Sequence, residues 1–323
     1  MKPLLIPLLR QLADGRFHSG ELLARSLNVS RATIWQILAD AEAIGARVFR
    51  VRGKGYRLEA PLEFLDAATV NARLDQASPI RLEVIDTLES TNSYLLEAAA
   101  KGAPHGIVIA TELQTRGRGR HGRRWHAGFA SALSFSLLWR FQDGVAGLSG
   151  LSLSVGLSVA QACEALGVKQ VKLKWPNDVI HGGRKLAGIL IEVHGEILGP
   201  SVAVIGIGVN YRLTGEAREA IDQPVVDLAT IANPLPSRNT VLAELLRSLA
   251  RVLTRFERGG FAPLAAEWEA RHAYQMKPVR IVLPDRSKVE GVAEGVGPDG
   301  ALRLRTAQGG LKFSVGEVSL RGS

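Results

Sequence analysis

The pattern of apolar and polar positions changes twice along the chain. Up to residue 60, apolar residues recur at helical spacing, as in Ile34, Ile37 and Leu38. From residue 61 to 274, apolar runs of strand length alternate with longer amphipathic segments, and beyond that only short runs separated by Gly and Pro remain. We expect an α+β, multidomain protein with domains at residues 1–60, 61–274 and 275–323.

The first domain has the pattern of a winged helix-turn-helix. The expected elements are the helices Leu4–Leu12 and Gly20–Leu27, a third helix that Ser30 caps and Gly45 ends, and the hairpin Arg47–Arg57. Two helices joined by a tight turn and followed by a hairpin are typical of this DNA-binding motif. A protein-interaction module is the alternative.

Charge favours DNA binding for this domain. Residues 1–60 hold ten Lys/Arg and five Asp/Glu, and the basic residues lie on the third helix and the hairpin. The candidate DNA contacts are Ser30, Arg31, Thr33, Gln36, Arg52 and Lys54. The helical pattern also turns Trp35 outward, but we expect its ring to be a buried anchor.

The middle segment predicts a mixed α/β arrangement. Expected strands are Ile80–Asp86, Ile107–Ala110, Ala132–Arg140, Val171–Lys174, Leu186–Val193 and Val202–Asn210. Expected helices are Leu65–Leu74, Tyr94–Lys101, Leu148–Leu166, Val241–Arg258 and one around Leu264–Arg271. The start of Leu148–Leu166 also fits a strand, but its length favours a buried helix, and residues 216–239 are expected to be irregular.

The last segment predicts a small β domain. Its expected strands are Val279–Leu283, Lys288–Val296, Ala301–Thr306 and Leu311–Val315, joined by turns rich in Gly, Pro and Asp. Short strands with such turns are typical of an SH3-like β-barrel.

The stretch Gln114–Trp125 is the most unusual part of the chain, with five arginines, three glycines and no acid. Apolar runs flank it, so we interpret it as a loop between two strands. Glycines let the backbone approach a ligand, and arginine forks suit phosphate or carboxylate. A disordered nucleic-acid-binding segment is the alternative, which Trp125 and the flanking strands disfavour.

Two further stretches carry polar groups in apolar surroundings, Ser90–Asn92 and Lys174–Lys185. Asn177 and Asp178 can hold ribose or phosphate-bound Mg²⁺, and Lys185 opens a strand. The plainer alternatives are a helix cap at Ser90 or Thr91 and a solvated strand end at Lys185. The seven histidines lack metal-ligand spacing and no P-loop spacing occurs, so we expect no metal site of the protein's own.

Composition indicates the kind of partner and the cellular compartment. A net charge of +9 favours an anionic partner, and the single Cys163 fits a reducing compartment. We expect a cytoplasmic protein with no membrane association, because we predict no stretch that is long and apolar enough to cross a bilayer.

The motifs together resemble the bifunctional biotin protein ligases, the biotin operon repressors, over essentially the whole chain. The stretches that carry the resemblance are Gly117–Trp125, Lys174–Asp178, Arg184–Leu190, Ser90–Asn92, Gly206–Asn210 and Gly316–Arg321, with Phe17–Glu21 and Gly53–Tyr56 for the repressor subclass. The fold that this implies for the middle domain is a class II synthetase-like, mixed-sheet biotin/lipoate ligase domain.

The resemblance implies a two-step reaction. Biotin and ATP with Mg²⁺ give biotinyl-5′-AMP, and biotin then passes to a lysine of the biotin carboxyl carrier protein. It implies biotin contacts at Ser90, Thr91, Asn92, Gln114, Arg118, Gly119, Arg120 and Lys185, and nucleotide contacts at Trp125, Asn177, Asp178 and Asn210. Lys185 and Arg120 would be catalytic. The adenylate would also act as corepressor for a homodimer on operator DNA.

Two other functions compete with this one. A lipoate–protein ligase shares the fold and the adenylation, but the arginine loop and the winged helix disfavour it. A transcription factor with a sensor domain that has lost catalysis is disfavoured by Arg118, Arg120 and Lys185. Members of the family often carry Lys-His where this chain has Gln36-Ile37, so the resemblance gives no operator sequence.

Overall fold

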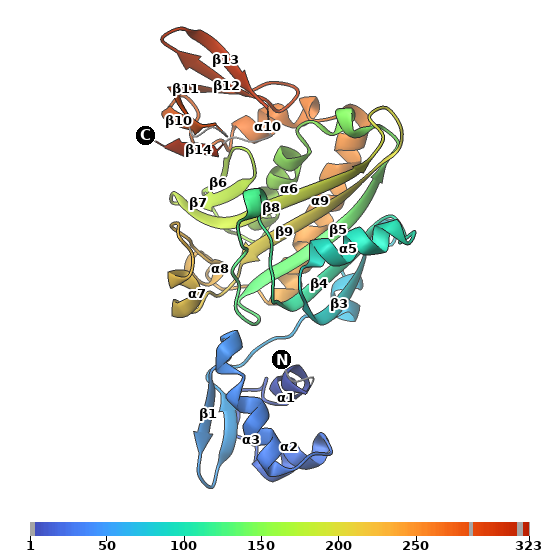
Figure 1. Ribbon diagram of the computed structural model, residues 1–323, viewed down its shortest axis with the longest axis vertical. Coiled ribbons are helices and arrows are strands. Elements are labelled where there is room, and N and C mark those ends of the chain that lie inside the picture. Colours follow the sequence, from blue (N-terminus) through green and yellow to red (C-terminus); the bar gives the residue numbers. More distant parts are fainter. Residues whose placement is uncertain (1–3, 284–286, 315–318, 323) are drawn as a thin grey trace.

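The computed structural model describes residues 4–283, 287–314 and 319–322. The chain forms three bodies along one long axis, with the N-terminal helices at one end and the C-terminal strands at the other (Figure 1). This is the α+β architecture that the sequence predicts.

The N-terminal body is a winged helix-turn-helix. It consists of α1 (Leu5–Gln11), α2 (Gly20–Ser26), α3 (Arg31–Ala39) and the antiparallel hairpin β1 (Val48–Val51) and β2 (Gly55–Leu58). The hydroxyls of Ser19 and Ser30 cap α2 and α3 by accepting hydrogen bonds from the amides of Leu22 and Thr33.

The third helix is shorter than predicted. It ends at Ala39, and the 3₁₀ turn η1 (Glu42–Ile44) follows. Gly45 then takes a left-handed φ of 85°, and the amide of Ala46 donates back to the carbonyl of Ala41. Because this closure uses Ala41, the expected continuous helix up to Gly45 is wrong.

A seven-stranded sheet forms the middle body, in the order β3-β4-β5-β9-β8-β7-β6. The strands are β3 (Arg81–Leu88), β4 (Ile107–Gln114), β5 (Ala132–Phe141), β6 (Val171–Lys174), β7 (Asp178–His181), β8 (Arg184–Gly195) and β9 (Ser201–Asn210). Only the β3–β4 pair is parallel among the described ladders of this sheet, so the sheet is mixed.

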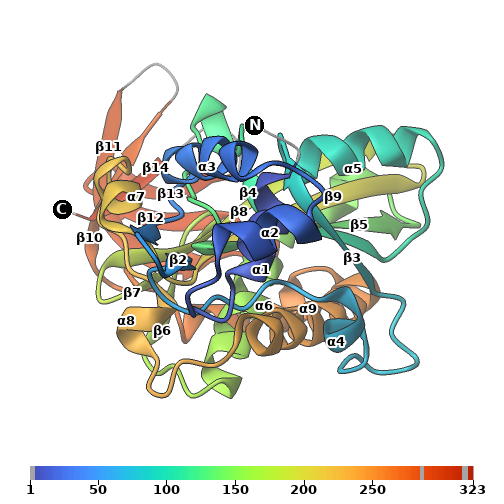
Figure 2. The same ribbon diagram turned by 90° about the horizontal axis from the view of Figure 1, so that it is seen from below.

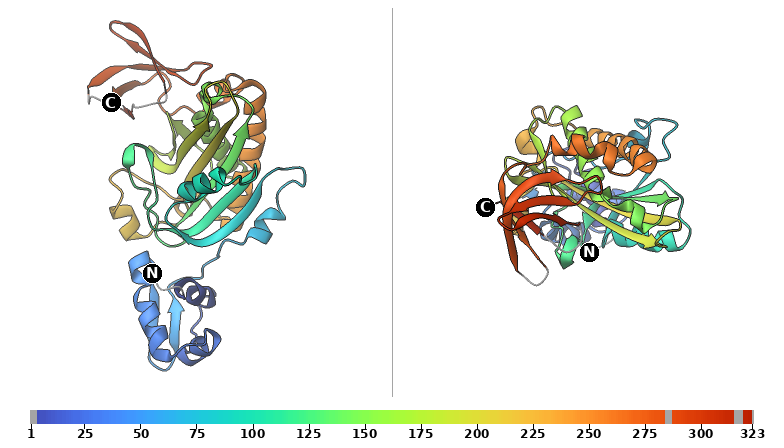
Figure 3. Two further views of the ribbon diagram at one scale, coloured as in Figure 1. Left: turned by 45° about the vertical axis from the view of Figure 1, so that its right-hand side comes forward. Right: turned by 90° about the horizontal axis from the view of Figure 1, so that it is seen from above.

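Helices cover both faces of this sheet (Figure 3). On one face α5 (Thr91–Ala100) buries Leu95 against Ile109, Leu138 and Val204. On the other face α6 (Leu151–Ala165) and α9 (Arg238–Gly259) pack on the sheet and on each other, and their apolar side chains form the main core. The helical interpretation of the apolar segment around α6 is therefore confirmed.

One segment corrects the prediction about membranes. By length and composition Val145–Ala165 is apolar enough to cross a bilayer, so the statement that no stretch reaches that length is wrong. The most apolar part of this segment is 67% buried within the protein. Its apolar surface is used for packing between the sheet and α9.

Short helices occur where we expected irregular chain. Within 216–239 these are α7 (Gly215–Glu219), capped by Thr214, and α8 (Leu228–Ile231), capped by Asp227. In both cases a capping side chain supplies the hydrogen bond that starts the helix. The linker helix α4 (Ala67–Asn71) and α10 (Ala265–Glu269) are shorter than predicted.

The C-terminal body is an antiparallel sheet in the order β13-β12-β11-β10-β14. Its strands are β10 (Pro278–Val282), β11 (Lys288–Val296), β12 (Leu302–Thr306), β13 (Gly309–Phe313) and β14 (Ser319–Gly322), the last of which we did not predict. Of the family-like stretch Gly316–Arg321, residues 316–318 lie outside the described part. The indole of Trp175 donates to the carbonyl of Gly300 at 3.1 Å and joins this body to the middle one.

Contacts between the winged helix and the middle body are part of a shared core. Leu113, Phe129 and Ala130 of the middle body are buried together with apolar residues of α1, α2 and α3. The amide of Phe129 donates to the carbonyl of Ile44 at 2.7 Å. Figure 2, seen from below, shows α1 and α2 in front of the strands of the middle body.

The linker is held by a buried ion pair. Arg238 at the start of α9 and Glu112 in β4 lie 2.7 Å apart, with side chains 1% and 0% exposed. Arg238 also donates to the main-chain carbonyl of Glu63, and Glu112 accepts from the amide of Leu65. Because breaking a buried pair leaves a buried charge unpaired, this pair fixes where the linker enters the middle body.

Candidate active site

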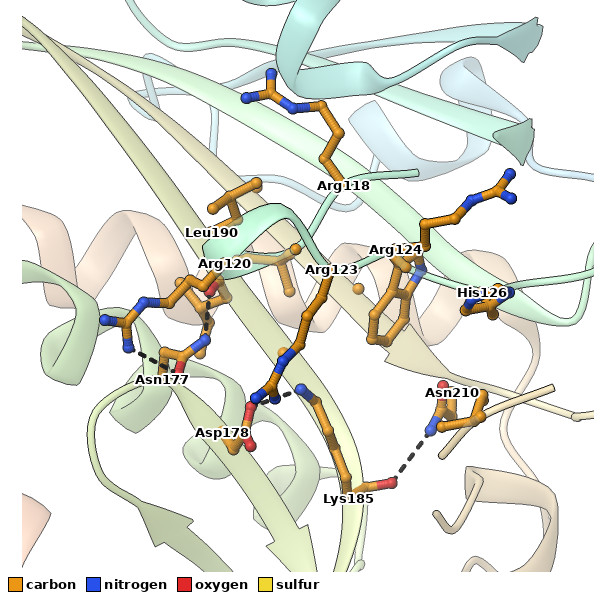
Figure 4. Close-up of a pocket in the computed structure, with 18 of the residues that line it drawn as sticks. Arg118, Arg120, Arg123, Arg124, His126, Asn177, Asp178, Lys185, Leu190 and Asn210 are labelled. Carbon is orange, nitrogen blue, oxygen red and sulfur yellow. Dashed lines mark hydrogen bonds and ion pairs between the residues drawn. The ribbon is translucent and has the colours of Figure 1, made fainter. Parts of the chain in front are cut away.

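The three polar stretches singled out in the sequence meet around one cavity of about 440 Å³. It lies over β8 and β9, under the loop between β4 and β5, and beside the N-terminus of α5 (Figure 4). All the predicted ligand residues line it: Ser90, Thr91, Asn92, Gln114, Arg118, Gly119, Arg120, Trp125, Asn177, Asp178, Lys185 and Asn210. The volume suits a small-molecule substrate.

A network of uncharged polar groups forms one end of the cavity. Gln114 accepts hydrogen bonds from the amide and the hydroxyl of Thr91 at 2.8 and 3.2 Å. The hydroxyl of Ser136 lies 2.7 Å from that of Thr91 and 2.6 Å from the Asn92 amide oxygen. Ser90 caps α5, so the plainer interpretation of that residue is confirmed alongside its place in the cavity.

Both polar atoms of the Asn92 side chain are hydrogen-bonded within the protein. Its Nδ2 donates to the carbonyl of Leu190 at 3.2 Å and to Glu192 at 2.9 Å. A Cβ on Gly206 would stand 2.1 Å from its Oδ1, so only glycine admits Asn92 at this point of β9. With its hydrogen-bonding groups engaged, Asn92 acts as a rigid part of the cavity floor.

The arginine loop is folded back on itself. The amide of Trp125 donates to the carbonyl of Gly117 at 2.9 Å, and that of Gly119 to the carbonyl of Arg123 at 2.8 Å. The loop therefore connects two strands, as predicted, and forms a narrow hairpin with the short 3₁₀ turn η2 (Arg120–Gly122) at its tip.

Trp125 closes this hairpin, and its ring packs against the glycine positions Gly208 and Gly188 of the sheet. Its Nε1 donates to the hydroxyl of Ser134 at 3.2 Å. A Cβ on Gly208 would stand 2.4 Å from the indole ring, so the ring depends on the missing side chain in β9. The indole therefore provides an apolar surface between the uncharged and the charged ends of the cavity.

The charged end is built around Lys185 and Asp178. The Lys185 ammonium lies 2.6 Å from the Asp178 carboxylate, and the two side chains are 17% and 15% exposed. The backbone of Lys185 pairs with the segment at Val225, and the side-chain Nδ2 of Asn210 donates to the Lys185 carbonyl at 3.1 Å. These bonds fix the start of β8, so Lys185 is not a solvated strand end.

Three cations belong to this end of the cavity: Lys185, Arg120 and Arg123 (Figure 4). Arg120 donates to the side-chain oxygen of Asn177 at 3.2 Å, and Arg123 extends toward Asp178 and Lys185. Burial lowers the pKa of the Arg120 guanidinium, and the carboxylate of Asp178 opposes that shift. Positive charge in excess of one carboxylate makes this end suited to phosphate.

Arg118 points away from these cations (Figure 4). It donates to Glu192 on β8 at 2.6 Å and to the hydroxyl of Ser93 at 3.2 Å. Glu192, Ser93, Ser136 and Arg123 did not appear among the predicted site residues. Glu192 had a signal in the sequence, because it is the acid within the apolar run of its strand.

The predicted DNA contacts lie on the winged helix. Arg31 and Gln36 are exposed on α3, and Arg52 and Lys54 are exposed at the wing tip. The hydroxyls of Ser30 and Thr33 lie 2.9 Å apart within the helix cap. The expectation of a buried Trp35 ring is wrong, because Trp35 is 55% exposed on the outer side of α3.

Comparison with known proteins agrees with this arrangement. Residues 5–57 match the model of an HTH domain, residues 84–210 that of the biotin/lipoate A/B protein ligase family, and residues 277–321 that of the biotin protein ligase C terminal domain. The bifunctional ligase/repressor BirA of Escherichia coli is 37% identical over 318 residues, which are 98% of this chain and 97% of that protein. The chain belongs to the biotin protein ligase family.

Other members of the biotin protein ligase family match as well. The biotin–[acetyl-CoA-carboxylase] ligase of Mycobacterium tuberculosis is 35% identical over 243 residues, 74% of this chain and 88% of that protein. The structure of the biotin protein ligase from Aquifex aeolicus in complex with biotin and ATP covers 75% of this chain and 99% of its own, with a TM-score of 0.65 and 29% identity. The mixed-sheet ligase fold predicted for the middle body is confirmed.

Proposed function

We propose that this protein is a biotin protein ligase that also represses transcription. It activates biotin with ATP to biotinyl-5′-AMP, transfers biotin to a lysine of the biotin carboxyl carrier protein, and binds operator DNA with the adenylate as corepressor. The observation that carries the ligase activity is the meeting of an uncharged hydrogen-bonded end and a cationic end in one cavity. Biotin, with a polar ureido ring and a carboxylate, matches that polarity.

In the first step a carboxylate oxygen of biotin attacks the α-phosphorus of ATP, and pyrophosphate leaves. Negative charge develops on the phosphate oxygens, and fixed cations stabilise it most effectively. We assign this role to Lys185 and Arg120. In the second step the neutral amine of the acceptor lysine attacks the carbonyl of the mixed anhydride, and AMP leaves.

We assign the uncharged end to biotin. Thr91 and Gln114 would contact the biotin ring, and Ser90 and Asn92 would form the floor. Gly119, Arg120 and Lys185 would lie toward the carboxylate, whereas Arg118, paired with Glu192, would border the biotin end. The nucleotide would lie between Trp125 and the pair Asn177 and Asp178. Asn210 has a buried Oδ1 without a hydrogen-bond partner among the described residues, which suits a donor on the nucleotide.

Magnesium would enter with ATP. No group of three or more His, Cys, Asp or Glu side chains able to hold a metal is found among the described residues. Asp178 offers a carboxylate and Asn177 an amide oxygen, which suits a cation otherwise held by phosphates and water. The ion would neutralise phosphate charge. The protein's part is to orient Asn177 through its bond to the Ile189 carbonyl at 2.9 Å and Asp178 through Lys185 at 2.6 Å.

The ligase activity is tested by offering the purified protein biotin, lipoate and ATP with a biotin carboxyl carrier domain. Mass spectrometry should find biotinyl-5′-AMP and a carrier heavier by one biotin. A lipoylated carrier would favour the lipoate ligase, and the absence of any adenylate would favour a sensor that has lost catalysis.

Repression rests on the winged helix and its basic outer surface. We propose that the adenylate-bound protein forms a homodimer on operator DNA, that the domains divide near residues 60 and 274, and that the protein works in the cytoplasm. Analytical ultracentrifugation with and without biotin and ATP tests the dimer. Fluorescence anisotropy of labelled duplex DNA under the same conditions tests the corepressor, since added biotin and ATP should tighten binding.

A further inference from the structure

The outward stripe of α3 is largely apolar. Its exposed positions are Arg31, Ala32, Trp35, Gln36 and Ala39. Two of these are alanines, and Trp35 has only its indole NH as a polar group. Trp35 is the largest of them and is 55% exposed. The indole is not part of the core, and it lies on the helix that helix-turn-helix proteins present to the major groove.

The charges around Trp35 indicate which partner. Arg50 of β1 places its guanidinium carbon 5.8 Å from the centre of the indole ring. On the same hairpin the guanidinium of Arg57 lies over the rings of Phe17 and Phe49, at 5.2 and 4.8 Å. Aromatic rings framed by arginines suit a polyanion that also presents apolar groups.

Duplex DNA offers one such group. The C5-methyl of thymine is the apolar feature of the major groove, and the N-terminal half of a recognition helix is the part that reaches base edges. Trp35 is the fifth of the nine residues of α3 and follows Arg31 by one helical turn, so the two side chains are neighbours on one face. We propose that Trp35 is a specificity-determining residue that packs on the methyl group of a thymine in the operator; this rests on the proposed repressor function.

The polar side chains near Trp35 on α3 are not suited to contact a thymine methyl group. The Ser30 hydroxyl accepts from the amide of Thr33 at 3.0 Å and lies 2.9 Å from the Thr33 hydroxyl, so both belong to the helix cap. Polar reading therefore falls to Arg31 and Gln36, side chains that pair with guanine and adenine respectively. The half-site expected from this stripe has purines read by these two residues beside a thymine read by Trp35.

Replacing thymine by deoxyuridine tests the proposal, because it removes only the C5-methyl. Full-length protein with biotin and ATP first selects duplexes from a random-sequence pool, and the selected duplex is remade with deoxyuridine. We expect wild type to bind the deoxyuridine duplex about fourfold more weakly for each methyl group on which an indole packs. Trp35→Ala should bind the two duplexes equally, and Trp35→Phe should keep part of the preference.

Leu22→Ala is the matched control, since Leu22 on α2 is an apolar side chain exposed by 60%. It should keep the wild-type preference for thymine, and both variants should biotinylate a carrier domain at the wild-type rate. A Trp35→Ala protein that still prefers thymine as wild type does would overturn the proposal. So would a Trp35→Ala protein that binds DNA normally but no longer dimerises, because Trp35 would then be a protein contact.

A protein that is not a repressor would give a different result in the same selection experiment. Wild-type protein would then enrich no duplex from the pool, although it still biotinylates the carrier. That result overturns the proposal together with the repressor function, whereas enrichment without thymine preference overturns the proposal alone.

Discussion

The ammonium group of Lys185 lies 2.6 Å from the carboxylate of Asp178, and both side chains are more than four-fifths buried. A ligand carboxylate or phosphate that is to use Lys185 must therefore compete with Asp178. Arg123 extends toward the pair, Arg120 lies beside the neighbouring Asn177, and both add positive charge that favours the ligand (Figure 4). We expect the attraction of this end for anions to depend on all three cations.

Replacing Lys185 by alanine should lower the adenylation rate by two or more orders of magnitude, the scale typical of a group that stabilises developing charge. The rate is measured by pyrophosphate release. Lys172→Ala is the control, because Lys172 lies on β6 and donates to the carbonyl of Ala270 outside the cavity. A Lys185→Ala rate within about threefold of wild type, with an unchanged melting temperature, removes Lys185 from the catalytic residues.

Arg120→Gly should release biotinyl-5′-AMP into solution. The substitution removes the bond from the loop to Asn177 and one cation of the phosphate end, so the adenylate escapes and acylates lysines of unrelated proteins. A streptavidin blot of bystander protein measures this labelling. Arg116→Gly serves as control, because Arg116 belongs to the same loop but pairs with Glu89 at the surface.

The alternative interpretation of the loop, a nucleic-acid patch, predicts another outcome for Arg120→Gly. Non-specific DNA affinity would fall, its salt slope would decrease by about one, and bystander labelling would stay at the wild-type level. That combination would show that the loop does not retain the adenylate.

Glu192→Gln should raise the KM for biotin about tenfold with little change in kcat. Glu192 holds both Asn92 in the cavity floor and Arg118 in the loop, so its loss loosens the pocket without touching the cations of the phosphate end. Initial rates at varied biotin separate the two parameters. Glu89→Gln breaks the exposed pair with Arg116 and should change neither, and an equally small effect of Glu192→Gln would refute the positioning role.

A chain that starts near Pro61 should still form adenylate and biotinylate a carrier domain. It keeps Glu63 and Leu65, whose bonds to Arg238 and Glu112 secure the linker. It also exposes Leu113 and Phe129, which the winged helix covers, so its melting temperature should be lower than that of the full chain. A folded truncated protein, verified by circular dichroism, that forms no adenylate would refute the domain division.

The sequence predicts the elements that follow regular periodicity. Apart from β7, which we did not predict, the strands around the cavity and the two core helices have clear apolar patterns. The loop Gln114–Trp125 stands out by composition alone. The end of α3 could not be predicted, because the turn at Gly45 uses a bond between Ala41 and Ala46 that no residue pattern announces. Nor could β14, because the strand is short and pairs with β10, which lies far away in the chain.

The sequence predicts which motifs form the candidate site, but it does not predict the hydrogen bonds that connect them. Asn92 can be predicted from its motif, but its fixation depends on Glu192 and on the missing side chain of Gly206, which lie about 100 residues away along the chain. The helical pattern turned Trp35 outward, as the structure has it, and only the expected burial of its ring was wrong. A tryptophan is apolar enough for the core, so residue type alone pointed the other way.

The path from Trp125, on the cavity floor, to Phe129, in the core of the winged helix, is only four peptide bonds long. Exchanging the first 60 residues for another DNA-binding domain would therefore change which DNA sequence is bound. It would also remove residues on which Phe129, just beyond the arginine loop, packs. We expect a hybrid that retains Ile44 and Gly45 to keep the hydrogen bond from the Phe129 amide, and with it the position of the segment that leads back to Trp125.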